Sequence, residues 1–431
     1  MKKLIRSAIT FACLSVGYLA YAQGFAVIEG LIPSPPRARE IVTRHIESRS
    51  EQDARSLAKD TYGPSHWTTR ANYLYYDSHR GYYIYTNDYV RKDNGKLLIL
   101  EPFALIWKSK DGGPVSTITG EKADVQFSSA PDLVRGGDEA RVVHASIERN
   151  VVIRDDKGTP ANLGDDLTIG PLTYLEYNED TDSITSDSPV IIRDRDTLAT
   201  ATTGVKIELR RQKATGKTGG GSMGYQGART IRLLGHVEIS VQDVGRTGMV
   251  PGGATQSARK AGEAEEPRPG EIVCDDDLLI EMPPPPPAGS RSEDPTYATF
   301  FTNVRIRQGD AQNPEQIDCD RLHLTLVPAE RSTNQTVASE NGGPVSDLTL
   351  KRAEATGHAV WLQSKARGFT GYGQQLIYER RTPEAPDFTY FKGDRYTLVT
   401  RKNAKEGTTD EVRSYDVTVY QPPRGTEPMT L

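Results

Sequence analysis

Only a few short segments of this chain carry residues whose types and spacing could do chemistry. The first is Thr215-Gly216-Lys217-Thr218, which ends as a phosphate-binding loop does. Such a loop needs a further glycine five residues before Gly216, and that position holds Arg211. No buried apolar strand precedes the segment and no helical pattern follows it, so the sequence excludes phosphate-loop chemistry here.

Grouped carboxylates are the second candidate. Asp275-Asp276-Asp277 is acidic enough for calcium but lacks the glycine and the spacing of an EF-hand loop, which favours a solvated turn. Asp194 and Asp196 are two residues apart, a spacing that any charged hairpin provides. The sequence contains no HExxH motif. We therefore assign no catalytic residue and expect a protein that is not an enzyme.

Cys274 and Cys319 have similar neighbours, since an isoleucine lies two residues before each of them and an aspartate follows. In an oxidising compartment such a pair can form a disulfide. Two small residues buried at equivalent places in neighbouring strands are the alternative, and both stay open because sequence does not fix the distance. Neither cysteine belongs to a CxxC motif and the seven histidines are scattered, so we expect no metal and no cofactor.

The first residues have the layout of a secretory signal peptide. Met1–Arg6 is basic, Ser7–Ala20 is apolar and uncharged, and Ala20-Tyr21-Ala22 offers a cleavage site before Gln23. We expect residues 1–22 to be removed after export. An uncleaved anchor is the alternative, because Gly24–Leu31 is also fairly apolar.

Charge excludes one class of partner. The chain has 53 basic and 58 acidic residues, and removing Lys2, Lys3 and Arg6 with the signal leaves 50 basic residues and a net charge of −8. No basic stripe stands out, which argues against nucleic acid as a partner.

The segments that could position a functional site show alternating apolar and polar residues. Leu175 and Tyr177 share one parity, and Val205, Ile207 and Leu209 alternate with Lys206, Glu208 and Arg210. Side chains that alternate with a period of two residues, with one face of the strand in solvent, are typical of antiparallel strands. The predicted fold class is therefore all-β.

Breaks in this pattern give the expected organisation. A helix is predicted within Arg37–Asp60, a hairpin turn at Asp93-Asn94-Gly95, and an exposed polyproline segment at Pro283–Pro287. Phe103, Leu105 and Trp107 share one face of a strand. The expected segments are a signal peptide at 1–22, an N-terminal linker with a short helix at 23–66, a first β module at 67–243, a low-complexity linker at 244–270 and a second β module at 271–431.

A weak internal repeat runs through both modules. Its first half is a turn residue followed by a strand, as in Asn150–Ile153, Gly235–Ile239, Asn303–Ile306 and Gly357–Trp361. Its second half is a small residue followed by spaced aliphatics, as in Ala201–Leu209, Cys274–Ile280, Cys319–Leu326 and Gly371–Tyr378. Stacked pairs of such strands bury the apolar face that one pair cannot.

The segment Leu172–Arg211 resembles the OstA-like periplasmic lipopolysaccharide-transport family, which includes LptA, LptC and the N-terminal part of LptD. Tyr174–Asn178, Ile184–Ile192 and Leu198–Leu209 carry the resemblance, and Ala353–Val360 with Phe369–Glu379 echo it in the second module. The linker, the proline run and the two modules depart from the family pattern.

The resemblance implies a β-jelly roll whose two sheets open along a seam, in the periplasm, with lipid acyl chains on the apolar inner faces. It also implies that lipopolysaccharide or a similar amphiphile is the partner, and that related jelly rolls join by pairing edge strands. The predicted lipid-binding inner face consists of Leu175, Tyr177, Val190, Ile192, Val205, Ile207, Val237, Ile239, Val360 and Leu362.

Two other functions stay open. The 20 tyrosines together with Trp67, Trp107 and Trp361 suit an exported polysaccharide-binding protein or enzyme, because aromatic faces stack on sugars. Trp107 and Trp361 lie within apolar strands, however, where packing in the core is the simpler interpretation. A non-catalytic scaffold of the cell envelope is the remaining alternative.

Overall fold

The computed structural model describes residues 49–77, 82–108, 115–130, 142–156, 166–194, 197–211, 225–242, 269–284, 294–309, 314–328, 348–365, 368–380, 387–403 and 407–421. The predicted signal peptide and nearly all of the 244–270 linker lie outside these residues. The described part contains one α-helix, two short 3-10 helices and strands β1 to β23. Every strand pair whose register is known is antiparallel, which confirms the predicted all-β class.

The chain divides into two compact units. The amino-terminal unit takes its described residues from Leu14–Arg195 and Gly204–Thr230, and the carboxy-terminal unit takes its own from Asp196–Thr203 and Ile231–Leu431. β15 and β16, on either side of the expected linker, pair directly and belong to one unit. Residues 244–270 therefore connect two neighbouring strands of the carboxy-terminal unit.

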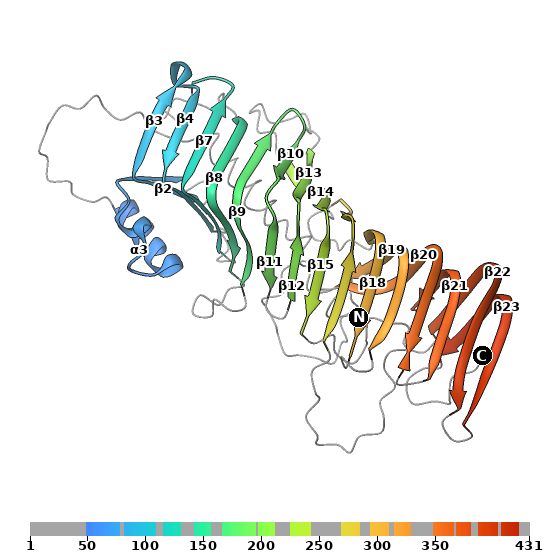
Figure 1. Cartoon of the computed structure of the whole chain (residues 1–431). Helices are drawn as coiled ribbons and strands as arrows, with labels where there is room; N and C mark the ends of the chain where they lie inside the picture. Colours follow the sequence, from blue (N-terminus) through green and yellow to red (C-terminus); the bar gives the residue numbers. More distant parts are fainter. Residues whose placement is uncertain are drawn as a thin grey trace, which may run out of the picture. The chain divides into compact units, whose positions relative to one another are not determined.

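The amino-terminal unit has two rows of hydrogen-bonded strands. The first row runs β1–β2–β5–β6–β8–β9–β11. The second row runs β3–β4–β7–β8–β9–β10–β13, and its strands are labelled in Figure 1. The bounds are β1 Tyr73–Asp77, β2 Tyr82–Thr86, β3 Asp88–Lys92, β4 Leu97–Glu101, β5 Phe103–Lys108, β6 Val115–Gly120, β7 Lys122–Phe127, β8 Val142–Asp155, β9 Leu167–Asn178, β10 Ser183–Ser186, β11 Val190–Asp194 and β13 Gly204–Arg211.

Bent strands join the two rows along one edge, which we call the corner. β8 and β9 belong to both rows, and their register shifts between Glu148 and Val151. Arg149 and Asn150 lie there with positive φ, which turns the strand sharply. β2 continues into β3, β4 into β5, β6 into β7 and β10 into β11 across the same corner. At the opposite edge, among the described residues, no strand of one row pairs with a strand of the other row.

The carboxy-terminal unit repeats this plan. Its first row runs β12–β15–β16–β18–β19–β20–β21–β22–β23, and its second runs from the end of β14 through β17 to the same long strands. The bounds are β12 Thr197–Ala201, β14 Tyr225–Leu234, β15 Val237–Val241, β16 Gly270–Cys274, β17 Leu278–Glu281, β18 Thr296–Gln308, β19 Glu315–Pro328, β20 Leu348–Ser364, β21 Phe369–Glu379, β22 Asp387–Asn403 and β23 Thr408–Gln421.

The sequence repeat marks the corners. Each turn residue that begins the first half lies where a strand passes from the second row to the first, and Asn150, Gly235 and Asn303 all have positive φ. Each small residue that begins the second half lies just before the strand passes back, as Cys274 and Cys319 do. A bent strand leaves little room on its inner side, which explains the small residues.

The inner faces of the two rows pack against each other in the carboxy-terminal unit. Phe391 in the second-row half of β22 is fully buried, and its ring centroid lies 6.5 Å from that of Phe369 in the first-row half of β21. A Cβ on Gly371 would lie only 2.6 Å from Phe391 Cζ. The missing side chain of Gly371 therefore makes the space that the Phe391 ring fills.

Helix α3 (Arg49–Tyr62) covers the outer face of the first strands. Ala58 packs with Ala71, Tyr85, Ala104 and Ile106 in one buried cluster. Both parities of β5 are consequently buried, Phe103 and Leu105 inward and Ala104 and Ile106 beneath the helix. The predicted helix and the turn at Asp93-Asn94-Gly95 are both present, the turn as a short 3-10 helix with Asn94 at φ 52°.

Candidate functional site

All ten residues of the predicted inner face are buried. Leu175, Tyr177, Val205 and Ile207 lie in the second row of the amino-terminal unit, and Val190 and Ile192 lie in its first row. Val237, Ile239, Val360 and Leu362 lie in the first row of the carboxy-terminal unit. Burial suits an ordinary core and a lipid-binding face equally, so the role of these residues stays a proposal.

Strand pairing brings several of these residues together. Ile184 of β10 pairs with Tyr177 of β9 on one side and with Ile207 of β13 on the other. Ile192 pairs with Ile169 across β11 and β9. Ile184 and Ile169 face the same interior, and sequence reasoning missed Ile184 because β10 has only four residues, too few for period two to stand out.

Residual exposure is small in both interiors. Ile147, Leu175, Val205 and Ile207 of the amino-terminal unit are between 6% and 9% exposed, and Tyr378 and Val417 of the carboxy-terminal unit are 9% and 8% exposed. Val190 and Val360, one in each unit, are at most 1% exposed. Exposure therefore does not distinguish the two interiors.

Cys274 and Cys319 are free thiols. Val304 pairs with Cys319, and the register of β16 on β18 places Cys274 on the other side of Val304. Two strand spacings of about 4.8 Å separate the cysteines, which exceeds the reach of a disulfide. Both are thus buried small residues, as in the alternative, but β18 separates their strands, so the strands are not neighbours. Burial raises the pKa of Cys274 to about 11 and that of Cys319 to about 12.

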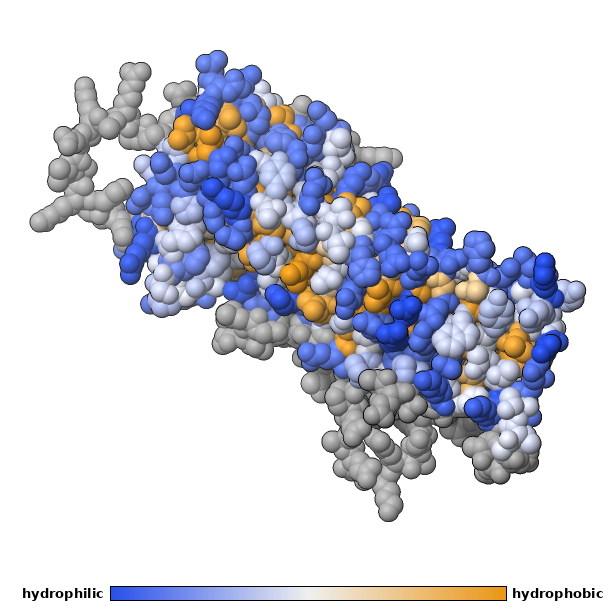
Figure 2. Space-filling view, in the orientation of Figure 1, coloured by the Kyte–Doolittle hydropathy of each residue, from blue (hydrophilic) through white to orange (hydrophobic). Residues whose placement is uncertain are grey.

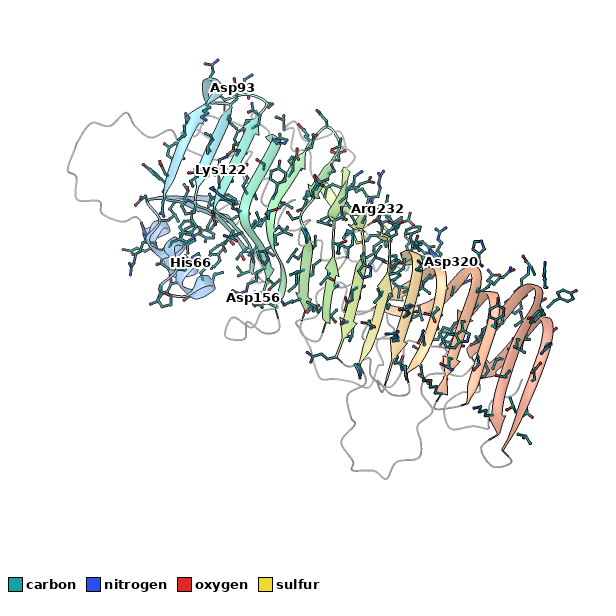
Figure 3. All side chains as sticks on the ribbon, viewed as in Figure 1. His66, Asp93, Lys122, Asp156, Arg232 and Asp320 are labelled. Atoms are coloured by element: carbon teal, nitrogen blue, oxygen red, sulfur yellow. The ribbon has the colours of Figure 1, made fainter. Side chains whose placement is uncertain are left out.

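The corner of the carboxy-terminal unit carries two His–Asp pairs. His236 Nδ1 lies 3.6 Å from Asp275 Oδ1, and the Asn303 amide donates to the same carboxylate at 2.8 Å. His358 Nδ1 lies 3.0 Å from Asp320 Oδ2, and the His358 backbone N–H also donates to this carboxylate. Figure 3 labels Asp320 on its strand. Both hydrogen bonds from His358 lower the pKa of Asp320. These side chains are exposed, and each pair links two strand segments at the point where the strands bend.

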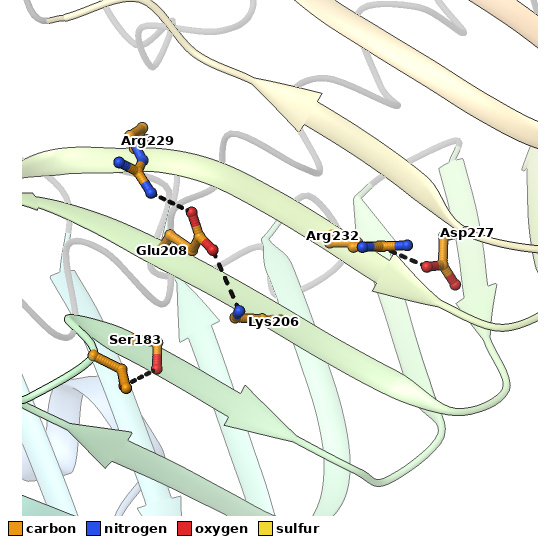
Figure 4. A network of polar contacts seen from close by, with 7 residues as sticks. Ser183, Lys206, Glu208, Arg229, Arg232 and Asp277 are labelled. Atoms are coloured by element: carbon orange, nitrogen blue, oxygen red, sulfur yellow. Dashed lines mark hydrogen bonds and ion pairs between the residues drawn. The ribbon is translucent and has the colours of Figure 1, made fainter.

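Asp275-Asp276-Asp277 forms the predicted turn between β16 and β17, but Asp277 is buried rather than solvated. Asp277 accepts from Arg232 Nε at 2.6 Å and from the backbone N–H of Gly235 at 2.8 Å (Figure 4). In the amino-terminal unit, Glu208 accepts from Arg229 at 2.6 Å, which lowers the pKa of this carboxyl. Each acidic group is thus engaged in structural pairing.

The other candidates from the sequence hold no site. Asp194 is buried at the end of β11, whereas Asp196 and Thr215–Thr218 lie outside the described residues. Within the described ranges, no three His, Cys, Asp or Glu side chains are close enough to hold a metal ion. The described helices include none that is long and apolar enough to cross a membrane.

Trp361 corrects one argument from the sequence. It lies between the buried residues Val360 and Leu362, and its own side chain is on the opposite, outward parity of β20 and only half-buried. Core packing therefore does not explain this tryptophan. Side-chain parity was the signal that could have found it.

Comparison with known proteins adds no relative. No protein-family model, no curated protein and no solved structure matches the chain.

Proposed function

We propose that this protein is a periplasmic, non-catalytic lipid carrier that shields acyl chains between its two rows of strands. In this proposal the fold is an open β-jelly roll, and the amphiphile is lipopolysaccharide or a lipid of similar build. The observation that carries the proposal is that two apolar faces meet while their strands are joined along only one edge.

The pairing pattern permits opening at low cost. In the amino-terminal unit, bent strands connect the rows at the corner, and the described strands form no ladder between the rows at the opposite edge. Separating the rows there breaks apolar contacts but no backbone hydrogen bond of the sheet. An unpaired buried backbone group costs about 1–3 kcal/mol, so a seam without such bonds is the easiest place to part.

The chemistry of the inner faces suits acyl chains. Ile147, Leu175, Val205 and Ile207 supply aliphatic surface without a charged group among them. Burial of apolar surface contributes about 25 cal/mol per Å², or about 0.8 kcal/mol for each methylene. A long acyl chain therefore needs no polar anchor to be held there.

We place the acyl compartment in the amino-terminal unit. In the carboxy-terminal unit, the ring of Phe391 fills the space that Gly371 leaves between the rows.

Pairing of edge strands would provide the route to protein partners. Among the described residues, β23 is paired on one side only, with β22. Its other edge offers backbone N–H and C=O groups to a strand of another β-jelly-roll protein. Lipid transfer between such proteins is the context in which we place the carrier.

Photocrosslinking in cells tests lipid binding directly. A photoreactive amino acid replaces Leu175 or Ile207 on the inner parity, and Glu176 or Lys206 one residue away on the outer parity. We expect lipopolysaccharide adducts from the inner positions at several times the yield of the outer ones. Leu362 serves as the inner position in the carboxy-terminal unit, and we expect weak labelling there.

Equal labelling from Ile207 and Lys206 contradicts the proposal, since the two side chains differ only in the face they occupy. Strong labelling from Leu362 with none from Leu175 keeps lipid binding but moves it to the other unit. Purification without detergent, followed by mass spectrometry of bound lipid, identifies the amphiphile. A bound glycan without lipid supports the polysaccharide-binding alternative.

A further inference from the structure

The outer face of the first row in the carboxy-terminal unit carries aromatic and apolar side chains at directly opposite positions. Trp361 of β20 pairs with Tyr372 of β21, which pairs with Leu398 of β22. We call these three residues the aromatic rung. Their chain neighbours Val360, Leu362 and Val399 are buried, so the rung points away from the interior.

A second rung of a different chemistry runs beside it. Gln316, Gln363, Thr370 and Thr400 lie opposite one another on β19, β20, β21 and β22, two residues along each strand from the first rung. We call these residues the amide–hydroxyl rung. All four are half-buried on the outer face and offer hydrogen-bond donors and acceptors without charge.

Charged residues border this face. Arg305 Nε lies 3.0 Å from Asp318 Oδ1 at one end, and Arg413 pairs with Glu411 at the other. Arg413 also lies over the ring of Tyr396, 6.0 Å from its centroid. Arg307 is exposed opposite Gln316, and Lys402 is exposed two residues from Thr400. The residues of the two rungs themselves carry no charge, so recognition by the rungs depends on stacking and on hydrogen bonds to amides and hydroxyls.

We propose that this face binds an oligosaccharide. A sugar ring has an apolar C–H face that stacks on an aromatic ring and a rim of hydroxyl groups that pair with amides and hydroxyls. The two rungs present these two chemistries side by side. The two aromatic residues of the rung, Trp361 and Tyr372, are one strand spacing apart, about 4.8 Å, which is about the length of one sugar ring.

Oligosaccharide binding and lipid binding use different parts of the protein. The oligosaccharide face lies on the outside of the carboxy-terminal unit, whereas the proposed acyl compartment is inside the amino-terminal one. Either function can fail without the other. The sugar can be a free oligosaccharide or the polar part of a glycolipid, and both present the same hydroxyl-rich chemistry.

Calorimetric titration of the full chain tests the inference with four probes: a glucose oligomer, an N-acetylglucosamine oligomer, lipid-free core oligosaccharide released from lipopolysaccharide, and intact lipopolysaccharide. We expect at least one lipid-free probe to bind. Tyr372→Ala should weaken it about tenfold, the factor that corresponds to 1.4 kcal/mol of lost stacking. Trp361→Ala should act similarly, and Gln363→Ala should weaken binding less.

Tyr297→Ala is the matched control. Tyr297 is 36% exposed on the second row of the same unit, and Tyr372 is 39% exposed, so the two truncations remove similar surface. We expect Tyr297→Ala to leave sugar binding unchanged. Lipid crosslinking from Leu175 should stay unchanged in Tyr372→Ala, which separates the two functions.

Binding of core oligosaccharide but not of the other lipid-free probes assigns the face to the polar part of a glycolipid, and binding of a homopolymer assigns it to a free polysaccharide. The inference is overturned if no lipid-free probe binds at millimolar concentration. It is also overturned if Tyr372→Ala and Trp361→Ala leave binding intact while the unfolding midpoint is unchanged. Self-association that Tyr372→Ala abolishes, without sugar binding, would show a protein interface instead.

Discussion

Single residues decide how closely the two rows approach. Gly371 faces Phe391 across the interior of the carboxy-terminal unit, and a Cβ at this glycine would lie 2.6 Å from the ring. No real Cβ tolerates that contact, so the ring or the strand must shift. Cores resist such added volume because they are packed as densely as organic crystals.

Gly371→Ala is expected to lower the free energy of unfolding by about 1–3 kcal/mol, the usual cost of overpacking. Urea denaturation measures it. In a Phe391→Leu background the smaller side chain leaves room for the new methyl group. Gly371→Ala should therefore destabilise that variant less than it destabilises the unaltered protein, by a difference of at least about 0.5 kcal/mol. Equal cost in both backgrounds contradicts the contact.

The two buried thiols make a second prediction at this scale. The raised pKa values of Cys274 and Cys319, about 11 and about 12, keep both protonated at pH 8, and only the thiolate reacts. In a Cys13→Ser variant, a thiol reagent at pH 8 should label neither residue until urea unfolds the chain. Stability should fall as pH rises from the ordinary value of 9.0 toward 11, because the unfolded thiols ionise first. Rapid labelling of the native protein would contradict this burial.

At the scale of elements, α3 closes the outer face that the first strands leave apolar. Tyr85 donates its hydroxyl to the backbone carbonyl of Ala54 at 2.8 Å, and Arg55 donates to the carbonyls of Thr69 and Ala71. The helix is therefore attached by hydrogen bonds from both sides as well as by apolar packing. A short amphipathic helix is marginal by itself, so this packing is what stabilises it.

Ala58→Glu places a charge in the cluster beneath the helix and should detach α3. Hydrogen–deuterium exchange should then show loss of protection at 49–62 and on β5, while strands of the carboxy-terminal unit stay protected. Ser56→Glu adds the same charge on the exposed side of the helix and serves as the control. Unchanged protection in Ala58→Glu would mean that the helix does not depend on this contact.

At the scale of the whole molecule, each unit has a corner that is fixed and an opposite edge where the rows only touch. The corner combines backbone bonds such as Asp275 N–H to Thr302 C=O at 2.9 Å with side-chain pairs such as His358–Asp320. Opening of the amino-terminal unit would therefore proceed as rotation about its corner. Ligand binding there should stabilise that unit more than the other.

Bound lipid should stabilise the folded protein by mass action, by about 2.7 kcal/mol of unfolding free energy at a ligand concentration 100 times Kd. The unfolding temperature should rise accordingly. Calorimetry with lipopolysaccharide below and above its binding concentration measures the shift. Ile207→Glu puts a charge into the proposed compartment and should abolish the shift, whereas Lys206→Glu on the outer face should not. A shift that persists in Ile207→Glu would locate the lipid elsewhere.

The sequence by itself determined the strands, because period two follows directly from which face of each strand meets water. The parity of Leu175, Ile207, Val237 and Leu362 predicted burial correctly for all of them. The repeat of turn residues and small residues also marked the corners, although the sequence could not say that both halves of a repeat belong to bent strands.

Only the tertiary structure decided what covers each face and which strands are neighbours. The sequence placed Phe103 and Leu105 on one face of β5, but the opposite face is buried as well, because α3 packs on it from a distant segment, and local patterns carry no record of that contact. Cys274 and Cys319 have matching neighbours in sequence, yet β18 lies between their strands. Trp361 is a further example. Long-range pairing sets the registers of β19 to β22, and these registers place Trp361 on one outer face together with Tyr372 and Gln363.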